Sequence, residues 1–358
     1  MGTKYHRLGD YIRPVDVRNR DLKVTELLGL SIEKKFIPSI ANTIGTDMST
    51  YKIVKPTQFA YVPVTSRNGD KITVALYEGA EPVLISQAYT VFEIIDHNAL
   101  LPEYLMMWFR RPEFDRYARF HSHGSAREVF DWDELCNVML PVPDIDRQRE
   151  IVAEYETLTN RIRLNEQIIQ RLEATAQALY RKMFVDNIDK QNLPTGWRIG
   201  TLGEICEIKY GKAHEHIPDG NIPIYGSGGI MRYGNKAIYT SESVLIPRKG
   251  SLNNILIINE PFWTVDTMFY SVAKMDYAMK YLYYVLRQYD FLSLDTGSAV
   301  PSMTTDFLYR IETIIPSEDT LKLFDENLDI IFKNILTYKK ENTKLTEFLS
   351  LLLAKMGK

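Results

Sequence analysis

The chain carries the same sequence pattern twice, at a constant separation of 173 residues between Gly124 and Gly297. Gly124-Ser125-Ala126 recurs as Gly297-Ser298-Ala299, and Lys182-Met183 recurs as Lys355-Met356 in the same register. One register that holds without a gap over about sixty positions does not arise by chance. The chain is therefore predicted to contain two copies of one structural module.

Each copy ends in a long segment whose apolar residues alternate in spacings of four and three. This heptad period indicates a coiled coil, in which a single seam asparagine costs stability and fixes the register. The first predicted seam comprises Ile151, Tyr155, Leu158, Ile162, Asn165, Ile169, Leu172, Ala176, Leu179 and Met183. The second comprises Phe324, Leu328, Ile331, Ile335, Tyr338, Asn342, Leu345, Leu349, Leu352 and Met356. The alternative is a core-facing helix of an ordinary bundle in each copy.

Two long helices are therefore expected at about 144–184 and 317–357, packed antiparallel. The segments before them are predicted to be mixed α/β, with strands at 72–77, 83–86 and 90–95 and again at 243–246, 255–258 and 268–272. Shorter helices are expected at 102–110, at 112–120 and near 277–288. The predicted fold class is a duplicated α/β (α+β) architecture, with two modules separated by the coiled-coil helices and related by a pseudo-twofold.

A length of 358 residues fits two domains with connections better than one core. We place the first module at 1–143, the first long helix at 144–184, the linker and second module at 185–316, and the second helix at 317–358. No apolar run opens the chain, and none reaches membrane-spanning length. Cys136 and Cys206 form no CxxC pair, which fits a reducing compartment. A cytoplasmic location is expected.

Patterns typical of nucleotide-binding and methyl-donor-binding enzymes are missing from the sequence. It has no GxxxxGK[ST] loop, no glycine-rich strand-to-helix fingerprint and no GxSxG elbow. Asn259-Glu260-Pro261-Phe262 is similar to the Asn-Pro-Pro-Phe loop of adenine methyltransferases, but Glu260 replaces the first proline. His121-Ser122-His123 and His214-Glu215-His216 lack the spacing that puts two metal ligands on one helix face. No catalytic, cofactor or metal site is expected in this chain.

Segments 64–70 and 245–251 resemble each other, and each combines an arginine with a flexible glycine. Arginine binds guanine and asparagine binds adenine, whereas lysine, serine and backbone amides hold phosphates. A plain hairpin turn favours the same residues and is the alternative. A net charge of −3 weakens the DNA interpretation unless positive charge is concentrated locally or supplied by partners. The candidate DNA contacts are Arg67, Asn68, Lys71, Ser125, Arg127, Ser227, Arg232, Arg248, Lys249, Ser251, Asn253, Asn254 and Ser298.

Several segments resemble the specificity subunit of type I restriction-modification enzymes. Leu193-Pro194-x-Gly196-Trp197, followed by Leu202-Gly203-Glu204-Ile205, resembles the opening of a target-recognition domain in that family, and segment 246–251 also resembles part of it. Pro141-Val142-Pro143 with Gln148, Glu150 and Ile151 resembles the family's entry into its long helix. The first copy departs from the pattern by starting near Leu8-Gly9-Asp10, and the second has Leu321 at the place of Gln148.

The resemblance implies a sequence-recognition subunit without a catalytic site. Each target-recognition domain would read one half of a split double-stranded DNA target, and the two antiparallel helices would set the spacing. Two modification subunits would methylate adenine with S-adenosylmethionine, and restriction subunits would use ATP and Mg. The residues alone leave two other functions open: a coiled-coil interaction scaffold without DNA specificity, and a diverged single-chain DNA methyltransferase or nuclease.

Overall fold

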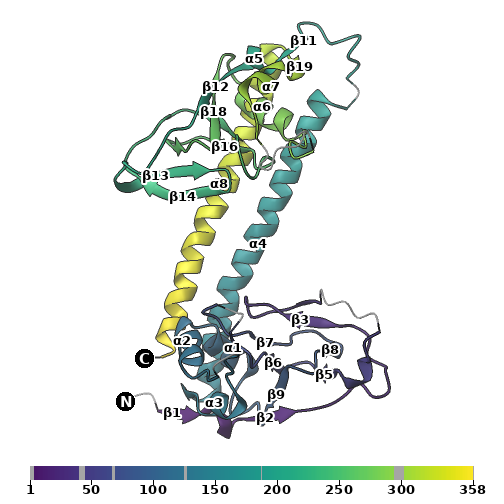
Figure 1. The fold of residues 1–358 in the computed structure, drawn as a ribbon, viewed down its shortest axis with the longest axis vertical. Coiled ribbons are helices and arrows are strands. Elements are labelled where there is room, and N and C mark those ends of the chain that lie inside the picture. The colour runs from purple at the N-terminus through teal and green to yellow at the C-terminus, as the bar shows by residue number, and fades with distance from the viewer. Residues whose placement is uncertain are drawn as a thin grey trace. The chain divides into compact units, whose positions relative to one another are not determined.

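The computed structural model describes residues 4–39, 45–66, 69–124, 127–186, 188–293 and 302–357. The chain divides into two compact units (Figure 1). Unit 1 comprises Met1–Leu164 together with Glu341–Lys358, and unit 2 comprises Asn165–Lys340. Each unit therefore contains one module and a part of each long helix.

The two predicted long helices are confirmed as α4 (Ile145–Phe184) and α8 (Glu318–Lys355). In unit 1, Arg161 Nε of α4 lies 2.8 Å from Glu341 Oε1 of α8. Glu150, which precedes Arg161 on α4, and Lys355, which follows Glu341 on α8, line one groove. In unit 2, the Phe184 and Phe324 ring centroids lie 4.9 Å apart, and Glu173 Oε1, earlier on α4, lies 3.9 Å from Lys339 Nζ, later on α8. The helix parts within each unit therefore run antiparallel.

Every residue of the two predicted seams is buried or partly buried in the structure. Asn165 is fully buried, and Asn342 Nδ2 donates to the backbone oxygen of Ile162 at 3.5 Å. Both polar seam residues thus lie on the inner face of their helix, where a polar group favours one register over others. The pseudo-twofold relation of the two modules stays a prediction.

Each module is built on a four-stranded antiparallel sheet, here called the framework sheet. In the first module its order is β2 (Ile12–Val15), β9 (Thr90–Ile94), β6 (Phe59–Tyr61) and β7 (Val74–Leu76). In the second module the order is β12 (Cys206–Tyr210), β18 (Met268–Ala273), β15 (Ser243–Pro247) and β16 (Leu256–Ile258). The two framework sheets have the same connectivity, which agrees with the duplication of the sequence.

The elements around each framework sheet also correspond. A short strand pair joins the start of each module to its end: β1 (Tyr5–Arg7) with β10 (Met139–Pro141), and β11 (Arg198–Thr201) with β19 (Glu312–Ile315). Helices α1 (Pro102–Phe109) and α6 (Met279–Leu286) follow the last framework strands, and α3 (Trp132–Cys136) and α7 (Thr305–Arg310) precede the closing strands. The short helices η1 (Leu8–Asp10) and α5 (Leu202–Ile205) also correspond, because each follows the opening strand. The first module adds α2 (Pro112–Phe120) and η2 (Met48–Thr50).

The segments inserted into the two framework sheets differ. The first module has the hairpin β3 (Leu28–Leu30) with β4 (Phe36–Pro38), and β5 (Lys52–Val54) paired antiparallel to β8 (Val83–Ile85). The second has a three-stranded sheet in the order β14 (Gly229–Gly234), β13 (Asp219–Gly226) and β17 (Trp263–Thr264), in which β13 and β17 run parallel. A common framework therefore carries two unlike inserts.

Each module packs onto the helix parts of its own unit. In unit 1, Val152 of α4 and Met356 beyond α8 join a core that includes Phe92 and Phe109. In unit 2, residues of both helices, among them Tyr180 and Phe324, join one core with residues of the framework sheet. Burial of these apolar surfaces fixes each module on its helices. Among the described residues, no helix has the length and apolar character needed to cross a membrane.

Candidate nucleic-acid interface

The structure brings together two of the candidate loops of the second module. The turn between β13 and β14 contains Ser227, whose backbone oxygen accepts a hydrogen bond from Asn254 Nδ2 at 2.8 Å. Gly250 adopts a positive φ of 82°, and a Cβ there would lie 2.8 Å from Ser227 Oγ. The positive φ favours glycine at position 250, and a side chain there would also force Ser227 Oγ to rotate away.

Arg248 lies beside this pair of loops, at the end of β15. Its guanidinium carbon lies 5.5 Å from the ring centroid of Tyr210, and Nη1 donates to the backbone oxygen of Asp266 at 3.3 Å. An arginine stacked on a ring is held in position while other donors stay available. Lys249 and Ser251 are exposed. These three side chains remain suited to contacts with DNA.

Two candidate asparagines mainly serve the loop itself. Asn254 holds Ser227, as described above. Asn253 Nδ2 donates to Asp290 Oδ1 at 2.8 Å, and this hydrogen bond holds the pKa of the Asp290 carboxyl below its ordinary value. Neither amide could reach an adenine without giving up a contact seen here, so their part in DNA recognition stays a prediction.

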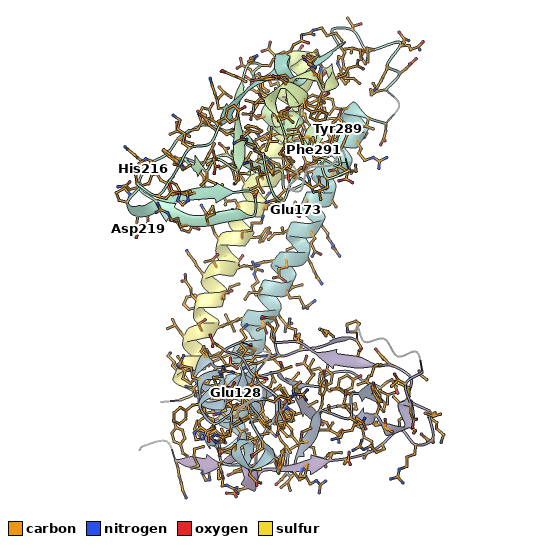
Figure 2. All side chains as sticks on the ribbon, in the orientation of Figure 1. Glu128, Glu173, His216, Asp219, Tyr289 and Phe291 are labelled. Atoms are coloured by element: carbon orange, nitrogen blue, oxygen red, sulfur yellow. The ribbon has the colours of Figure 1, made fainter. Side chains whose placement is uncertain are left out.

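The guanidinium of Arg232 is occupied by protein groups. Nη2 donates to the backbone oxygens of Ile217, at 2.8 Å, and of His214, and Nε donates to His214 Nδ1 at 3.2 Å. Nη1 lies 3.2 Å from Asp219 Oδ1. Asp219 and His216, three residues earlier, are labelled in Figure 2. Arg232 therefore ties the segment before β13 to strand β14, a role that the sequence did not suggest.

The first module offers fewer described candidates. Lys71 Nζ lies 2.9 Å from Glu33 Oε1, and this exposed pair raises the pKa of the Lys71 ammonium and lowers the pKa of the Glu33 carboxyl. Arg127 is exposed. The remaining candidates, Arg67, Asn68, Ser125 and Ser298, lie outside the described residues.

In both modules, a residue of the candidate loop forms a β-bridge with a residue near the end of the module. Val64 forms a bridge with Val129 in the first module, and Lys249 forms one with Ser302 in the second. Val129 and Ser302 are separated by the same 173 residues as the Gly-Ser-Ala segments before them. The loop after the third framework strand thus lies beside the segment that follows Gly-Ser-Ala in each module.

The strand register shows that the sequence match between segments 64–70 and 245–251 is wrong at its first half. Ala60 pairs with Val91 and Leu245 pairs with Tyr270, at equivalent places in the two framework sheets. Leu245 therefore corresponds to Ala60 and not to Val64. Counted back from the following strand, however, Arg67 and Arg248 both stand eight residues before the framework residues Ala75 and Leu256.

The two loops therefore differ in length. Fifteen residues separate Ala60 from its partner Ala75, whereas eleven separate Leu245 from its partner Leu256. The bridged residues Val64 and Lys249 both lie four residues after Ala60 and Leu245, so the extra four residues of the first loop follow Val64. Arg248 stands three residues after Leu245 of β15 and directly before the bridged Lys249, so strand and bridge together position it.

His121 and the two cysteines have defined surroundings in the structure. His121 Nδ1 lies 3.1 Å from Glu134 Oε2. Among the described residues, no group of three or more histidine, cysteine or acidic side chains could hold a metal ion. Both cysteines are buried, and burial raises the pKa of the Cys206 thiol to about 12. A thiol with such a pKa is not a nucleophile at neutral pH.

Comparison with known proteins assigns the family. The family model for the type I restriction modification DNA specificity domain matches the chain twice, over residues 18–174 and 194–347. The HindI type I restriction enzyme specificity subunit of Haemophilus influenzae is 20% identical, over 91% of this chain and 91% of that protein. The crystal structure of the type I restriction-modification S subunit from M. genitalium has a TM-score of 0.66 at 16% identity, covering 99% of this chain and 96% of that chain.

The two family matches begin and end close to the two sequence copies, and together they cover most of the chain. The structural similarity independently supports the fold. The chain belongs to the type I restriction-modification DNA specificity family, whose members are non-catalytic DNA-recognition subunits of restriction-modification complexes.

Proposed function

We propose that the chain reads a DNA target made of two separated parts, one with each module, and carries modification and restriction subunits to that target. The observation that carries this proposal is the pair of framework sheets with the same strand order and unlike inserts. A shared framework suits a shared task, and unlike inserts suit two different base sequences. The loops described above lie within the module that would use them.

The net charge of −3 limits what this chain contributes to affinity. Binding to phosphates requires lysine and arginine, and each neutralised phosphate makes binding more sensitive to salt. Lys249, Arg248 and Arg127 supply positive charge near the candidate loops, whereas the charge of Lys71 is balanced by Glu33. We propose that the partner subunits supply much of the remaining phosphate contact, while this chain mainly selects the sequence.

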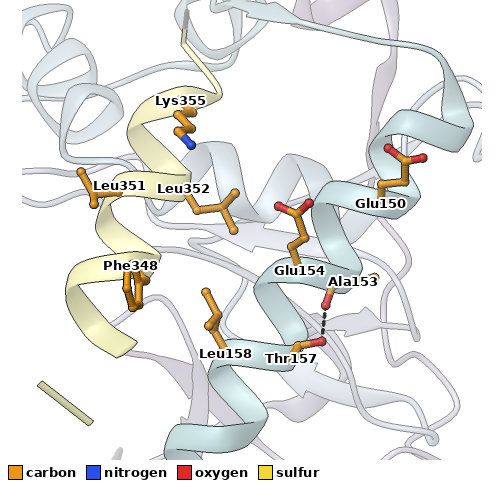
Figure 3. Close-up of a pocket in the computed structure, with 9 residues that line it drawn as sticks. All are labelled: Glu150, Ala153, Glu154, Thr157, Leu158, Phe348, Leu351, Leu352 and Lys355. Atoms are coloured by element: carbon orange, nitrogen blue, oxygen red, sulfur yellow. Dashed lines mark hydrogen bonds between the residues drawn. The ribbon is translucent and has the colours of Figure 1, made fainter. Parts of the chain in front are cut away.

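The long helices offer apolar surface for those partners. In unit 1, a groove of about 810 Å³ lies between α4 and α8 and is flanked by Phe348 and Leu351, which are exposed (Figure 3). In unit 2, Leu323, Ile330 and Leu336 of α8 are exposed as well. Exposed apolar clusters on helices suit protein partners. We propose that two modification subunits bind there and that restriction subunits join the complex.

In the proposed division of labour, the partner subunits hold every cofactor. The modification subunits would transfer a methyl group from S-adenosylmethionine to adenine, and the restriction subunits would use ATP and Mg. This chain would contribute target choice and spacing in the cytoplasm, where the DNA lies.

The test is to assemble the chain with its modification subunits and to map methylated adenines in a random DNA library. The proposal expects two blocks of specified bases with a fixed unspecified spacer. Methylation without any sequence preference would instead indicate an interaction scaffold. Methylation by this chain alone, abolished by a point mutation in it, would indicate a single-chain methyltransferase.

A further inference from the structure

Strand β14 exposes an unusual amount of apolar surface. Ile230, Met231 and Tyr233 are 49%, 57% and 50% exposed, although the strand has only six residues. β14 is also an edge strand, because it pairs with β13 on one side only in its three-stranded sheet. Exposed apolar residues on an edge strand are a liability unless they have a partner.

The ribbon formed by β13 and β14 is held rigidly from behind. Ile224 of β13 is fully buried and packs with Ile217, Trp263 and Val265 in a small core of its own. Arg232 ties the segment before β13 to β14, and Asn254 ties the turn of the ribbon to the Arg248 loop. A preorganised element with exposed apolar side chains loses little conformational entropy on binding.

Positive charge lies at the margins of this ribbon. Lys236 follows β14, and Lys212 lies beside β17 at the other side of the small sheet, where its backbone N–H donates to Thr264. Both lysines are exposed. The acidic Asp219 is paired with Arg232, while Glu215 is exposed. An apolar ridge between two cations matches a DNA groove between two phosphate strands better than it matches a protein surface.

We propose that the β13–β14 ribbon enters the major groove of the half-site read by the second module, and that Ile230, Met231 and Tyr233 contact thymine methyl groups. This inference rests on the proposed function. The major groove admits a two-stranded ribbon, and the thymine methyl is the apolar group that it displays. The ribbon replaces the differently paired β3–β4 and β5–β8 inserts of the first module, so the contact belongs to one half-site.

The test uses the chain assembled with its modification subunits and DNA containing the mapped target. Uracil replaces each thymine of one half-site in turn, which removes only the methyl group. We expect the wild-type complex to bind at least one such target of the second half-site roughly fourfold more weakly, the value for one buried methyl-sized group. Met231→Ser, Ile230→Ser or Tyr233→Ser should bind the thymine and uracil targets equally at the base that it contacts.

Ile199→Ser is the matched control, because Ile199 is another exposed apolar residue of unit 2, on β11 away from the ribbon. This control should keep the full sensitivity to uracil, and all variants should keep wild-type discrimination in the first half-site. Uracil substitution without effect, or with the same effect in the wild type and in all three ribbon variants, would overturn the inference. If the wild-type complex showed no preference for any base sequence in either half-site, the proposed function itself would be refuted.

Discussion

Lys280 Nζ lies 2.7 Å from Asp325 Oδ1, and this contact links α6 of the second module to α8 within unit 2. The ammonium also lies 3.0 Å from Glu242 Oε1 and 2.9 Å from Asp329 Oδ1, while the lysine is only 3% exposed. One buried cation thus serves three carboxylates, two of them one turn apart on the long helix.

Lys280→Met is expected to destabilise unit 2 by about 3 kcal/mol, because removing one member of a buried ion group leaves the others uncompensated. Asp329 is partly exposed and keeps some hydration, which limits the loss. Hydrogen exchange of the backbone amides in α6 would measure this destabilisation of unit 2. Lys322→Met on the exposed face of α8 is the control and should stay within about 0.5 kcal/mol. Equal effects of the two substitutions would contradict a structural role for Lys280.

Glu242 makes this network dependent on pH. Burial raises the pKa of its carboxyl above the ordinary value of 4.5, although Lys280 opposes the shift. The stabilisation that Glu242 provides is therefore fully present below pH 4.5. It is lost as the pH rises through the raised pKa of Glu242 in the folded protein. The destabilisation caused by Glu242→Gln should be smaller at pH 7 than at pH 4.5. Urea unfolding at both pH values tests this, and a larger cost at pH 7 would contradict it.

The Gln148 side chain links the start of α4 to the first module by hydrogen bonds. The fully buried amide accepts a hydrogen bond from Leu101 N at 2.9 Å and donates to the backbone oxygens of Ala99 and Pro143. Gln148→Leu leaves these groups unpaired and should cost roughly 2–4 kcal/mol in unit 1. Leucine at the matching position 321 of the second copy is buried without such a role. A thermal midpoint equal to that of the wild type would refute the assignment.

Leu172→Asp is expected to destabilise the paired helices by roughly 2–5 kcal/mol, since it removes an apolar seam contact and places a charge there. Leu172 is partly buried, whereas the adjacent Glu173 (labelled in Figure 2) is exposed. Glu173 Oε1 lies 3.9 Å from Lys339 Nζ. Glu173→Ala should therefore cost no more than about 1 kcal/mol. Thermal unfolding followed by helical circular dichroism compares the two variants. An unchanged midpoint for Leu172→Asp would place that residue outside the seam.

Arg67→Ala and Arg248→Ala should each relax sequence discrimination in one half-site only, the first for module one and the second for module two. Loss of a bidentate arginine–guanine contact costs roughly 1–3 kcal/mol at one base pair, whereas loss of a phosphate contact weakens all sequences and lowers the salt dependence. Methylation of substituted targets by the assembled complex separates these outcomes. If neither variant changes the methylation pattern, the two loops are hairpin turns.

The long helices could be predicted well because a heptad period is a local and repeated signal. The strands at 83–86, 90–95 and 268–272 were also predicted within one residue of β8, β9 and β18, since each is a short apolar run between turn residues. Helix α2 matches its predicted bounds, which begin at Pro112. These elements depend on nearby residues, so the sequence contains the necessary information.

The β13–β14 ribbon was not predicted. β13 contains glycine, asparagine and proline, which favour turns, and the predicted strands of the second module begin only at residue 243. Its strand character depends on pairing with β14 and with Trp263-Thr264, which lie elsewhere in the sequence. Arg232 was a plausible DNA contact for the same reason, because its partners His214 and Ile217 become neighbours only in the folded ribbon. Contacts between distant segments, and not local propensity, decide these sites.

The division of the chain imposes an order on folding during synthesis. Unit 2 is a continuous stretch, so the ribosome delivers all of it before the last segment of the chain. Unit 1 needs residues 341–358, and Met356 closes its core while the Tyr5 hydroxyl donates to the Gly357 oxygen at 2.9 Å. The module made first is therefore completed last, and a nascent chain that stalls before residue 341 exposes the apolar surface of the first module while the second is already whole.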